Sequence, residues 1–163
     1  PYTFSKDIGE EILELYRQHF NLRGSITRFY NVYGPNQLTE GGYTTLIGRW
    51  LNNIEKGIQC EIYGDGEQRR DFTHVDDIVD ALIAAANSKL ANKVYNVGSD
   101  TTVSVNKIVE LLGGEKVNIP KRPGEPDCTY ADISKIKSSA TANLGKFKLS
   151  KIKIIARTNL FFI

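Results

Sequence analysis

The sequence predicts an α/β protein built around one hydrophobic core. Helical and strand-like patterns alternate along the chain, and this alternation is typical of the α/β class. The 163 residues are 40% apolar and 25% charged, which is close to the average of globular domains and enough for a single core. The net charge is +2 and the basic residues are mostly dispersed, so the composition does not favour nucleic acid as a partner.

Two helices and a strand are predicted in the first third of the chain. From Phe4 to Phe20, large apolar residues recur about every four positions with charged residues between them, which predicts an amphipathic helix. Residues 25–32 are rich in β-branched and aromatic side chains and run into a Gly-Pro turn, so they predict a strand. A Gly-rich loop at residues 41–42 then leads to a helix over residues 44–55.

Shorter elements continue the alternation after this helix. The pattern predicts strands over residues 60–63, 71–75, 94–97 and 116–119. Asp76 or Asp77 is expected to cap one helix, and Ser104 is expected to cap another. The apolar face of the first of these helices consists of Ile78, Ala81, Leu82 and Ala85. Residues 138–163 show no pattern that predicts an element, and we expect them to form a tail.

Tyr2 and Lys6 form the first candidate for a catalytic site. Residues four apart stand on one face of a helix, so this phenol and this ammonium can act on one ligand. A nearby ammonium favours the phenolate, which is a usable general base. The alternative is a structural pair, because a chain with eight tyrosines and many lysines contains about one such spacing by chance. Spacing alone favours that alternative.

Asn31 lies at the end of the predicted strand over residues 25–32. Ligands of open α/β sheets bind beyond the carboxyl ends of the strands, so this amide is well placed to hold a sugar hydroxyl. Asn is also a preferred turn residue, and Asn31 and Asn36 could instead satisfy turn backbone. From the residues alone the two interpretations are equally supported.

Two charged turns supply candidates for binding an anionic ligand. Arg69 and Arg70 follow a Gly-Asp-Gly turn, and a guanidinium there suits a diphosphate because its planar fork binds phosphate oxygens in pairs. Arg122 and Glu125 lie on a Pro-Gly turn, where they could hold a phosphate and a ribose diol. Solvated turns with surface salt bridges need the same residue types, and chemistry alone favours that alternative for both turns.

His74, Cys60 and Cys128 are expected to have structural roles. The cysteines are far apart without a metal-like spacing, and the two histidines of the chain complete no familiar zinc pattern with them. We therefore expect no metal, and we interpret the cysteines as reduced thiols of a cytoplasmic protein. The apolar segment over residues 152–163 is too short and too charged to span a bilayer, so no membrane association is expected.

Five motifs occur in a recognisable order. They are PYTFSK, TRFYNVYGPNQ, IYGDGEQRRDFTHVDDIVDA, YNVGSD and RPGEPDCTYADISKIK. Together they resemble the C-terminal half of NAD-dependent nucleotide-sugar epimerases and dehydratases of the extended short-chain dehydrogenase/reductase family, especially the UDP-glucose and UDP-N-acetylglucosamine 4-epimerases. The resemblance covers residues 1–137. It implies the C-terminal part of a Rossmann-type NAD(P)-binding fold with a small α/β substrate-binding lobe, and the N-terminal βαβ units are missing. Residues 138–163 would be a divergent tail.

The resemblance implies a role for each candidate residue. Tyr2 resembles the catalytic base that takes the proton of the sugar 4-hydroxyl while hydride passes to NAD. Lys6 would hold the nicotinamide ribose and stabilise the phenolate, and Phe29 would line the nicotinamide pocket, so all three are implied to bind the cofactor. Arg70 and Arg122 resemble diphosphate-binding arginines. The implied UDP-sugar-binding residues are Asn31, Tyr63, Arg70, Arg122 and Glu125.

The sequence also departs from the family pattern. It contains no Gly-rich dinucleotide fingerprint, which the family carries in its N-terminal region. It also contains no methionine, not even at position 1. We therefore expect the chain to be a fragment that is inactive alone, and its parent is expected to form a homodimer through the helix of Tyr2.

Three alternatives remain open. One is a 4,6-dehydratase or decarboxylase of the same family, although those branches tend to carry acidic residues beside the tyrosine, where this chain has Thr3 and Phe4. Another is a non-catalytic module that binds nucleotide sugars through Arg70, Arg122 and Glu125. The last is an unfolded remnant, which would result if the missing strands left too much apolar surface uncovered.

Overall fold

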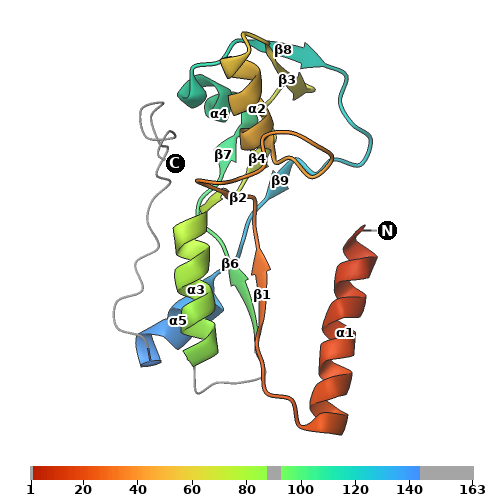
Figure 1. Cartoon of the computed structure of the whole chain (residues 1–163), viewed down its shortest axis with the longest axis vertical. Helices are drawn as coiled ribbons and strands as arrows, with labels where there is room; N and C mark the ends of the chain where they lie inside the picture. The colour runs from red at the N-terminus through yellow and green to blue at the C-terminus, as the bar shows by residue number, and fades with distance from the viewer. Residues whose placement is uncertain (1, 88–92, 144–163) are drawn as a thin grey trace.

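The computed structural model describes residues 2–87 and 93–143, in which helices and short strands alternate (Figure 1). The helices are α1 (Tyr2–Phe20), α2 (Leu46–Glu55), α3 (Val75–Asn87), α4 (Val105–Leu112) and α5 (Ser134–Asn143). The strands are β1 (Ile26–Phe29), β2 (Val32–Tyr33), β3 (Cys60–Tyr63), β4 (Arg69–Arg70), β5 (Thr73–His74), β6 (Val94–Val97), β7 (Val103–Ser104), β8 (Lys116–Ile119) and β9 (Cys128–Thr129). This alternation confirms the predicted α/β class.

Parallel strand pairs dominate the sheet structure. β1 pairs with β6, β2 with β5, and β3 with β8, all in parallel. β4 lies between β7, its antiparallel neighbour, and β9, its parallel neighbour. Parallel strands need long crossover connections, and helices such as α3 supply them, as expected for the C-terminal part of a Rossmann-type fold.

The first core packs α2 and α4 against β3 at the upper end of the molecule in Figure 1. Its centre is Trp50, whose side chain is 1% exposed. The other buried members are Tyr33, Ile47, Cys60, Ile62, Phe72, Val105, Ile108 and Val109. The hydroxyl of Ser104 accepts from the Lys107 amide, which confirms the predicted cap of α4. The hydroxyl of Thr45 caps α2 by accepting from the Gly48 amide, so α2 begins two residues later than predicted.

The second core packs α3 and α5 around β6 at the lower end of the molecule in Figure 1. Its members are Ile78, Ala81, Tyr95, Val97, Ala131, Ile133 and Ile136. Two separate clusters therefore replace the single core that the composition suggested.

Helix α1 stands beside this body and buries none of its residues (Figure 1). Its apolar stripe is that of the predicted amphipathic helix, yet Tyr2, Phe4, Ile12 and Phe20 are all exposed. The helix begins at Tyr2, so the whole Tyr2-to-Lys6 spacing is helical, as the catalytic hypothesis requires.

Two predicted strands are wrong in detail. The strand over residues 25–32 is interrupted between β1 and β2 because Asn31 adopts a φ of 28°, a left-handed value that a strand cannot contain. The strand predicted over residues 71–75 shrinks to β5, and Val75 already belongs to α3. Local β-propensity does not register such breaks, because hydrogen bonds from other segments impose them.

The predicted start of α3 is also wrong. Asp76 and Asp77 lie within the first turn, where their charge suits the helix dipole, and neither precedes the helix as a cap. The imidazole Nδ1 of His74 takes the capping role by accepting from the Asp76 amide at 3.2 Å. Leu82 was expected on the buried face but is 42% exposed, and Ala84 is buried instead.

The predicted tail is partly helical. α5 runs from Ser134 to Asn143 and so includes the first residues of the segment 138–163, for which no element was expected. Residues 144–163 lie outside the described residues. The short strands β7 and β9 were not predicted either, because two residues carry too little pattern.

Replacing Trp50 with alanine is expected to lower the free energy of unfolding by about 3–5 kcal/mol, because it empties the centre of the first core. Urea unfolding followed by circular dichroism measures this loss. Leu38→Ala, at an exposed loop position, is the control and should change stability by less than about 0.5 kcal/mol. Equal losses in the two variants would contradict the assigned core.

Candidate active site

Tyr2 and Lys6 lie on the first two turns of α1. The Lys6 Nζ is 5.3 Å from the centroid of the Tyr2 ring, so the two side chains lie on one side of the helix. The Tyr2 side chain is 75% exposed. Because α1 descends beside β1, which rises, its N-terminus lies toward the carboxyl end of β1 (Figure 1). That end of a parallel sheet is where ligands of this fold class bind.

An ion pair holds α1 against β1. The guanidinium of Arg28 donates two hydrogen bonds to the carboxylate of Glu10, at 2.7 and 2.6 Å. A further bond joins the Arg17 guanidinium to the carbonyl of Gly24 at 2.5 Å. The hydrogen bonds and charge of Arg28 lower the pKa of Glu10, and Glu10 raises the pKa of Arg28. The position of the Tyr2–Lys6 pair relative to the sheet therefore depends on these contacts.

Phe29 and Asn31 lie at the carboxyl end of β1, the end predicted to face the ligand. The Phe29 ring is exposed there. The Asn31 Nδ2 donates to the carbonyl of Asp71 at 2.8 Å, so this half of the amide satisfies backbone. That contact is the turn-stabilising alternative considered for Asn31. Its role toward a sugar hydroxyl, like that of Phe29 toward nicotinamide, stays a prediction.

Arg70 and Glu125 form the most buried ion pair of the candidate site. The Arg70 Nη2 lies 2.7 Å from the Glu125 Oε1, and the side chains are 11% and 25% exposed. The second Glu125 oxygen, Oε2, is buried and has no hydrogen-bond partner within the described part of the chain. A buried acceptor without a donor is unfavourable, so this oxygen is suited to accept from a ligand hydroxyl.

Arg122, on the same turn as Glu125, forms a second contact pair with Tyr63 at the end of β3. The Arg122 guanidinium carbon is 3.7 Å from the centroid of the Tyr63 ring, a cation–π stack. A hollow of about 210 Å³ opens beside the two pairs. It is lined by Tyr63, Gly64, Asp65, Glu67, Gln68, Lys121, Glu125 and Asp127, so the two arginines lie beside it and not in its lining. Sequence-distant candidates for nucleotide binding thus lie together around one turn, residues 120–127.

Asp71 was missed by the reasoning from sequence. It is buried and accepts hydrogen bonds from Ser99 and from the Ala131 amide. In the sequence it is one of several acidic residues in a charged block, and nothing there marks it as buried. The interpretation of His74 as structural agrees with its capping of α3.

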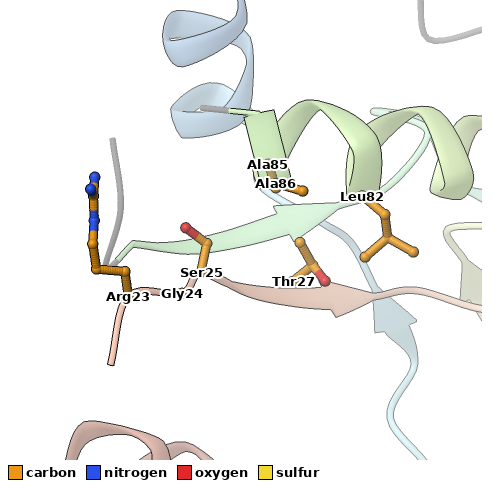
Figure 2. A pocket seen from close by; sticks show the side chains of 7 residues that line it. All are labelled: Arg23, Gly24, Ser25, Thr27, Leu82, Ala85 and Ala86. Carbon is orange, nitrogen blue, oxygen red and sulfur yellow. The ribbon is translucent and has the colours of Figure 1, made fainter. Parts of the chain in front are cut away.

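A larger hollow lies away from the candidate residues, between the start of β1 and the last turns of α3 (Figure 2). It measures about 600 Å³ and is lined by Arg23, Gly24, Ser25, Thr27, Leu82, Ala85 and Ala86. The Arg23 side chain extends away from the α3 residues in Figure 2. The hollow faces the amino end of β1, whereas Asn31 follows its carboxyl end, so its position does not fit the nucleotide site.

Residues 2–87 and 93–143 contain two thiols but neither a metal-binding cluster nor a membrane-spanning helix. No group of three or more His, Cys, Asp and Glu side chains is arranged there to hold a metal ion. Cys60 is buried, Cys128 is exposed, and both are free thiols. Burial raises the pKa of the Cys60 thiol. None of the helices in these ranges combines the length and apolar character that crossing a membrane requires.

The parallel strand pairs and the helices between them define an α/β protein with a Rossmann-type fold. Residues 1–98 match the NAD dependent epimerase/dehydratase family, and the chain belongs to this family. The resemblance inferred from the motifs is thereby confirmed. Dehydratases and a decarboxylase also occur among the relatives, so the family match alone does not choose the reaction.

Three similar proteins define the extent of the match. A Bacillus subtilis protein named an uncharacterized UDP-glucose epimerase is 37% identical over 84% of this chain and 44% of its own length. UDP-N-acetylglucosamine 4-epimerase from Methanobrevibacter ruminantium superposes with a TM-score of 0.83 at 30% identity, covering 94% of this chain and 49% of that one. UDP-glucuronic acid 4-epimerase from Bacillus cereus, solved with UDP-glucuronic acid and NAD, gives a TM-score of 0.74 at 28% identity, covering 93% and 47%. The chain therefore spans about half the length of these proteins.

The Glu10–Arg28 pair should make the docking of α1 dependent on pH. The pKa of Glu10 is lowered in the folded chain, so the pair contributes its stability above the unfolded glutamate pKa of about 4.3 and loses it as the pH falls through the lower, folded value. Because both side chains are partly exposed, the contribution should stay below about 1 kcal/mol.

An NMR titration of the Glu10 carboxyl carbon measures this effect. The Glu10 midpoint should rise in Arg28→Ala, because the guanidinium that lowers the pKa of Glu10 is gone. An unchanged midpoint in Arg28→Ala would show that the ion pair does not form in solution.

Proposed function

We propose that this chain carries the catalytic tyrosine and the nucleotide-sugar site of an NAD-dependent UDP-sugar 4-epimerase. The observation that carries the proposal is the convergence of Arg70, Glu125, Tyr63 and Arg122 on one turn. Several relatives and solved neighbours are named as UDP-sugar 4-epimerases, which supports the epimerase reading over other members of the family.

The diphosphate and ribose of the substrate are assigned to the ion-paired residues. Two of the five N–H donors of Arg70 are engaged, with Glu125 and with the Arg69 carbonyl, which leaves donors for phosphate oxygens. Arg122 presents a second guanidinium over Tyr63, whose ring is suited to pack beside the nucleotide base. The unpartnered Oε2 of Glu125 would accept from a ribose hydroxyl.

The cofactor is assigned to Tyr2, Lys6 and Phe29. The donor set fits one end of NAD, because a phenol and an ammonium lie on one exposed helix face, where both can reach a ribose hydroxyl. When bound, NAD would accept hydride from the sugar C4 and return it to the other face. Tyr2 takes the proton of the 4-hydroxyl during oxidation and gives it back during reduction. Lys6 stabilises the phenolate in between.

Two further features of the parent protein belong to this proposal. The exposed apolar stripe of α1 suits a homodimer in which the two copies of this helix pack together. Cytoplasmic location follows from the nucleotide-sugar substrate and from the free thiols. The fragment is proposed to bind UDP but to be inactive alone, since it contains no Gly-rich cradle for the cofactor pyrophosphate.

A 4,6-dehydratase is the second candidate, because enzymes of this class are among the relatives. Thr3 and Phe4 next to Tyr2 provide no acidic group to help remove water from the sugar. A full-length chain supplied with UDP-glucose and dTDP-glucose discriminates between the two. Formation of UDP-galactose supports the epimerase, and formation of a 4-keto-6-deoxy sugar supports the dehydratase.

The isolated chain is expected to bind UDP, and Arg70→Ala should weaken that binding roughly 10- to 100-fold, because it removes a charge-assisted hydrogen bond donor. Isothermal titration calorimetry measures the change. Arg49→Ala, at an exposed arginine of α2, is the matched control and should bind like the parent chain. Equal affinity in the Arg70 and Arg49 variants would remove Arg70 from the site.

In a full-length protein completed with the upstream half of a relative, Tyr2→Phe should lower kcat by a factor of about 10² to 10⁴, because it removes the general base. UDP affinity should not change, since Tyr2 is not assigned to the nucleotide. The matched control is Tyr16→Phe, three to four turns further along the same helix. If Tyr2→Phe and Tyr16→Phe turn over substrate equally fast, Tyr2 is not the base.

A further inference from the structure

Asp71 is a fully buried carboxylate next to Arg70, with 0% of the residue exposed. It forms no salt bridge with any described residue, and its hydrogen-bond partners are neutral donors. Its Oδ1 accepts from the Ser99 amide at 2.8 Å and the Ser99 hydroxyl at 2.7 Å, with the Thr73 hydroxyl at 3.4 Å. Its Oδ2 accepts from the Ala131 amide at 3.3 Å.

The arrangement requires an acid at this position. One backbone N–H points at each carboxylate oxygen, that of Ser99 at Oδ1 and that of Ala131 at Oδ2. A carboxylate can accept at both oxygens, whereas an amide must place its own NH₂ against one of these donors, whichever way it is turned. An asparagine would therefore keep the shape of the side chain but lose one of the two hydrogen bonds from the backbone amides.

The surrounding backbone fits closely around this carboxylate. A Cβ atom on Gly98 would lie 2.6 Å from Asp71 Oδ2 and 2.4 Å from the Ala131 Cβ. The turn at residues 98–99 thus approaches the carboxylate as closely as only glycine permits. A charge buried without a cation costs several kcal/mol, and the hydrogen bonds from Ser99 and Ala131 offset part of that cost.

Asp71 also fixes the backbone from which the proposed binding residues extend. Its amide donates to the Thr129 carbonyl at 3.0 Å, which continues the pairing of β4 with β9 just beyond Arg70. Its carbonyl accepts from the Asn31 Nδ2 at 2.8 Å. One residue therefore sets the position of Arg70 through the chain and that of Asn31 through a hydrogen bond.

We propose that Asp71 is the positioning residue of the UDP-sugar site. Its carboxylate anchors the end of β4 to the turn at Ser99 and to Ala131, and this anchoring aims the Arg70 guanidinium at the diphosphate and holds the Asn31 amide at the strand end. Asp71 touches neither substrate nor cofactor and acts through Arg70. The inference rests on the proposed UDP binding of this chain.

A double-mutant cycle on UDP binding tests the proposal in the full 163-residue chain. Asp71→Asn should weaken UDP binding about tenfold in the parent background. In the Arg70→Ala background the same substitution should change affinity by less than about twofold, because the residue through which it acts is gone. If Asp71→Asn weakens UDP binding by the same factor in both backgrounds, the proposal is overturned.

Two further variants separate positioning from loss of stability. Ile136→Ala, in the second core, should lower the melting temperature and leave UDP affinity unchanged at a temperature where circular dichroism shows the chain folded. Ser99→Ala removes one hydroxyl donor to Asp71 and should weaken UDP binding roughly threefold. This variant replaces Asp71→Asn in the test if Asp71→Asn does not fold. If Ile136→Ala weakens UDP binding as much as the Asp71 or Ser99 variant, the proposal is overturned.

The result for the parent chain keeps the two proposals distinguishable. If the unmodified chain binds no UDP, the proposed function fails. The positioning role of Asp71 is then tested by NMR instead of by UDP binding. The signals of the Asn31 side-chain amide and the Arg70 Nε should shift in Asp71→Asn, or in Ser99→Ala, and should stay in place in Ile136→Ala. Unshifted signals in the Asp71 and Ser99 variants overturn the proposal.

Discussion

The fold around the candidate site depends on hydrogen bonds to one buried carboxylate. Asp71 lies between the two cores, since the next residue, Phe72, packs in the first core and its partner Ala131 packs in the second. Burial of its charge costs free energy, which the donors of Ser99 and Ala131 offset. Its carbonyl adds a further bond, from Asn31. Segments that are 28 to 60 residues apart in sequence thus meet at one point.

This junction explains why weak sequence signals become a site. Each charged turn could equally be a solvated surface feature, because arginine and glutamate are common on solvated turns as well as in binding sites. Pairing of β4 with β9 brings the turn over residues 120–127 against Arg70, so Arg70 meets Glu125 and leaves the second carboxylate oxygen unpartnered. The chemistry of the site is therefore created by tertiary pairing between segments whose own sequences do not specify it.

Much of the fold follows from the sequence, and its limits have physical causes. Helices such as α2 and α4 are predictable because their caps and apolar periodicity are local. The break at Asn31 and the start of α3 at Val75 are not, because contacts from distant segments impose them. Residue chemistry indicated most of the candidate residues only weakly. The motif resemblance added Phe29 and Tyr63 and gave each candidate a role, because it carries information on spacing between segments that local chemistry lacks. Asp71 escaped notice because burial of a single acid leaves no pattern.

Helix α1, in contrast, is specified by its own sequence but held only weakly against the rest of the fold. Its sequence specifies the helix, and the helix sets the spacing of Tyr2 and Lys6, so the proposed catalytic pair needs no tertiary contact to lie on one helix face. Its placement on the sheet rests on partly exposed hydrogen bonds, chiefly Glu10 with Arg28, and such pairs are worth at most about 1 kcal/mol. Covering the exposed apolar stripe of α1 would contribute far more, at roughly 25 cal/mol per Å². Catalysis needs a base fixed to within a fraction of an ångström. The proposed role of Tyr2 as base therefore implies that the apolar face of α1 packs against a partner surface in the active protein.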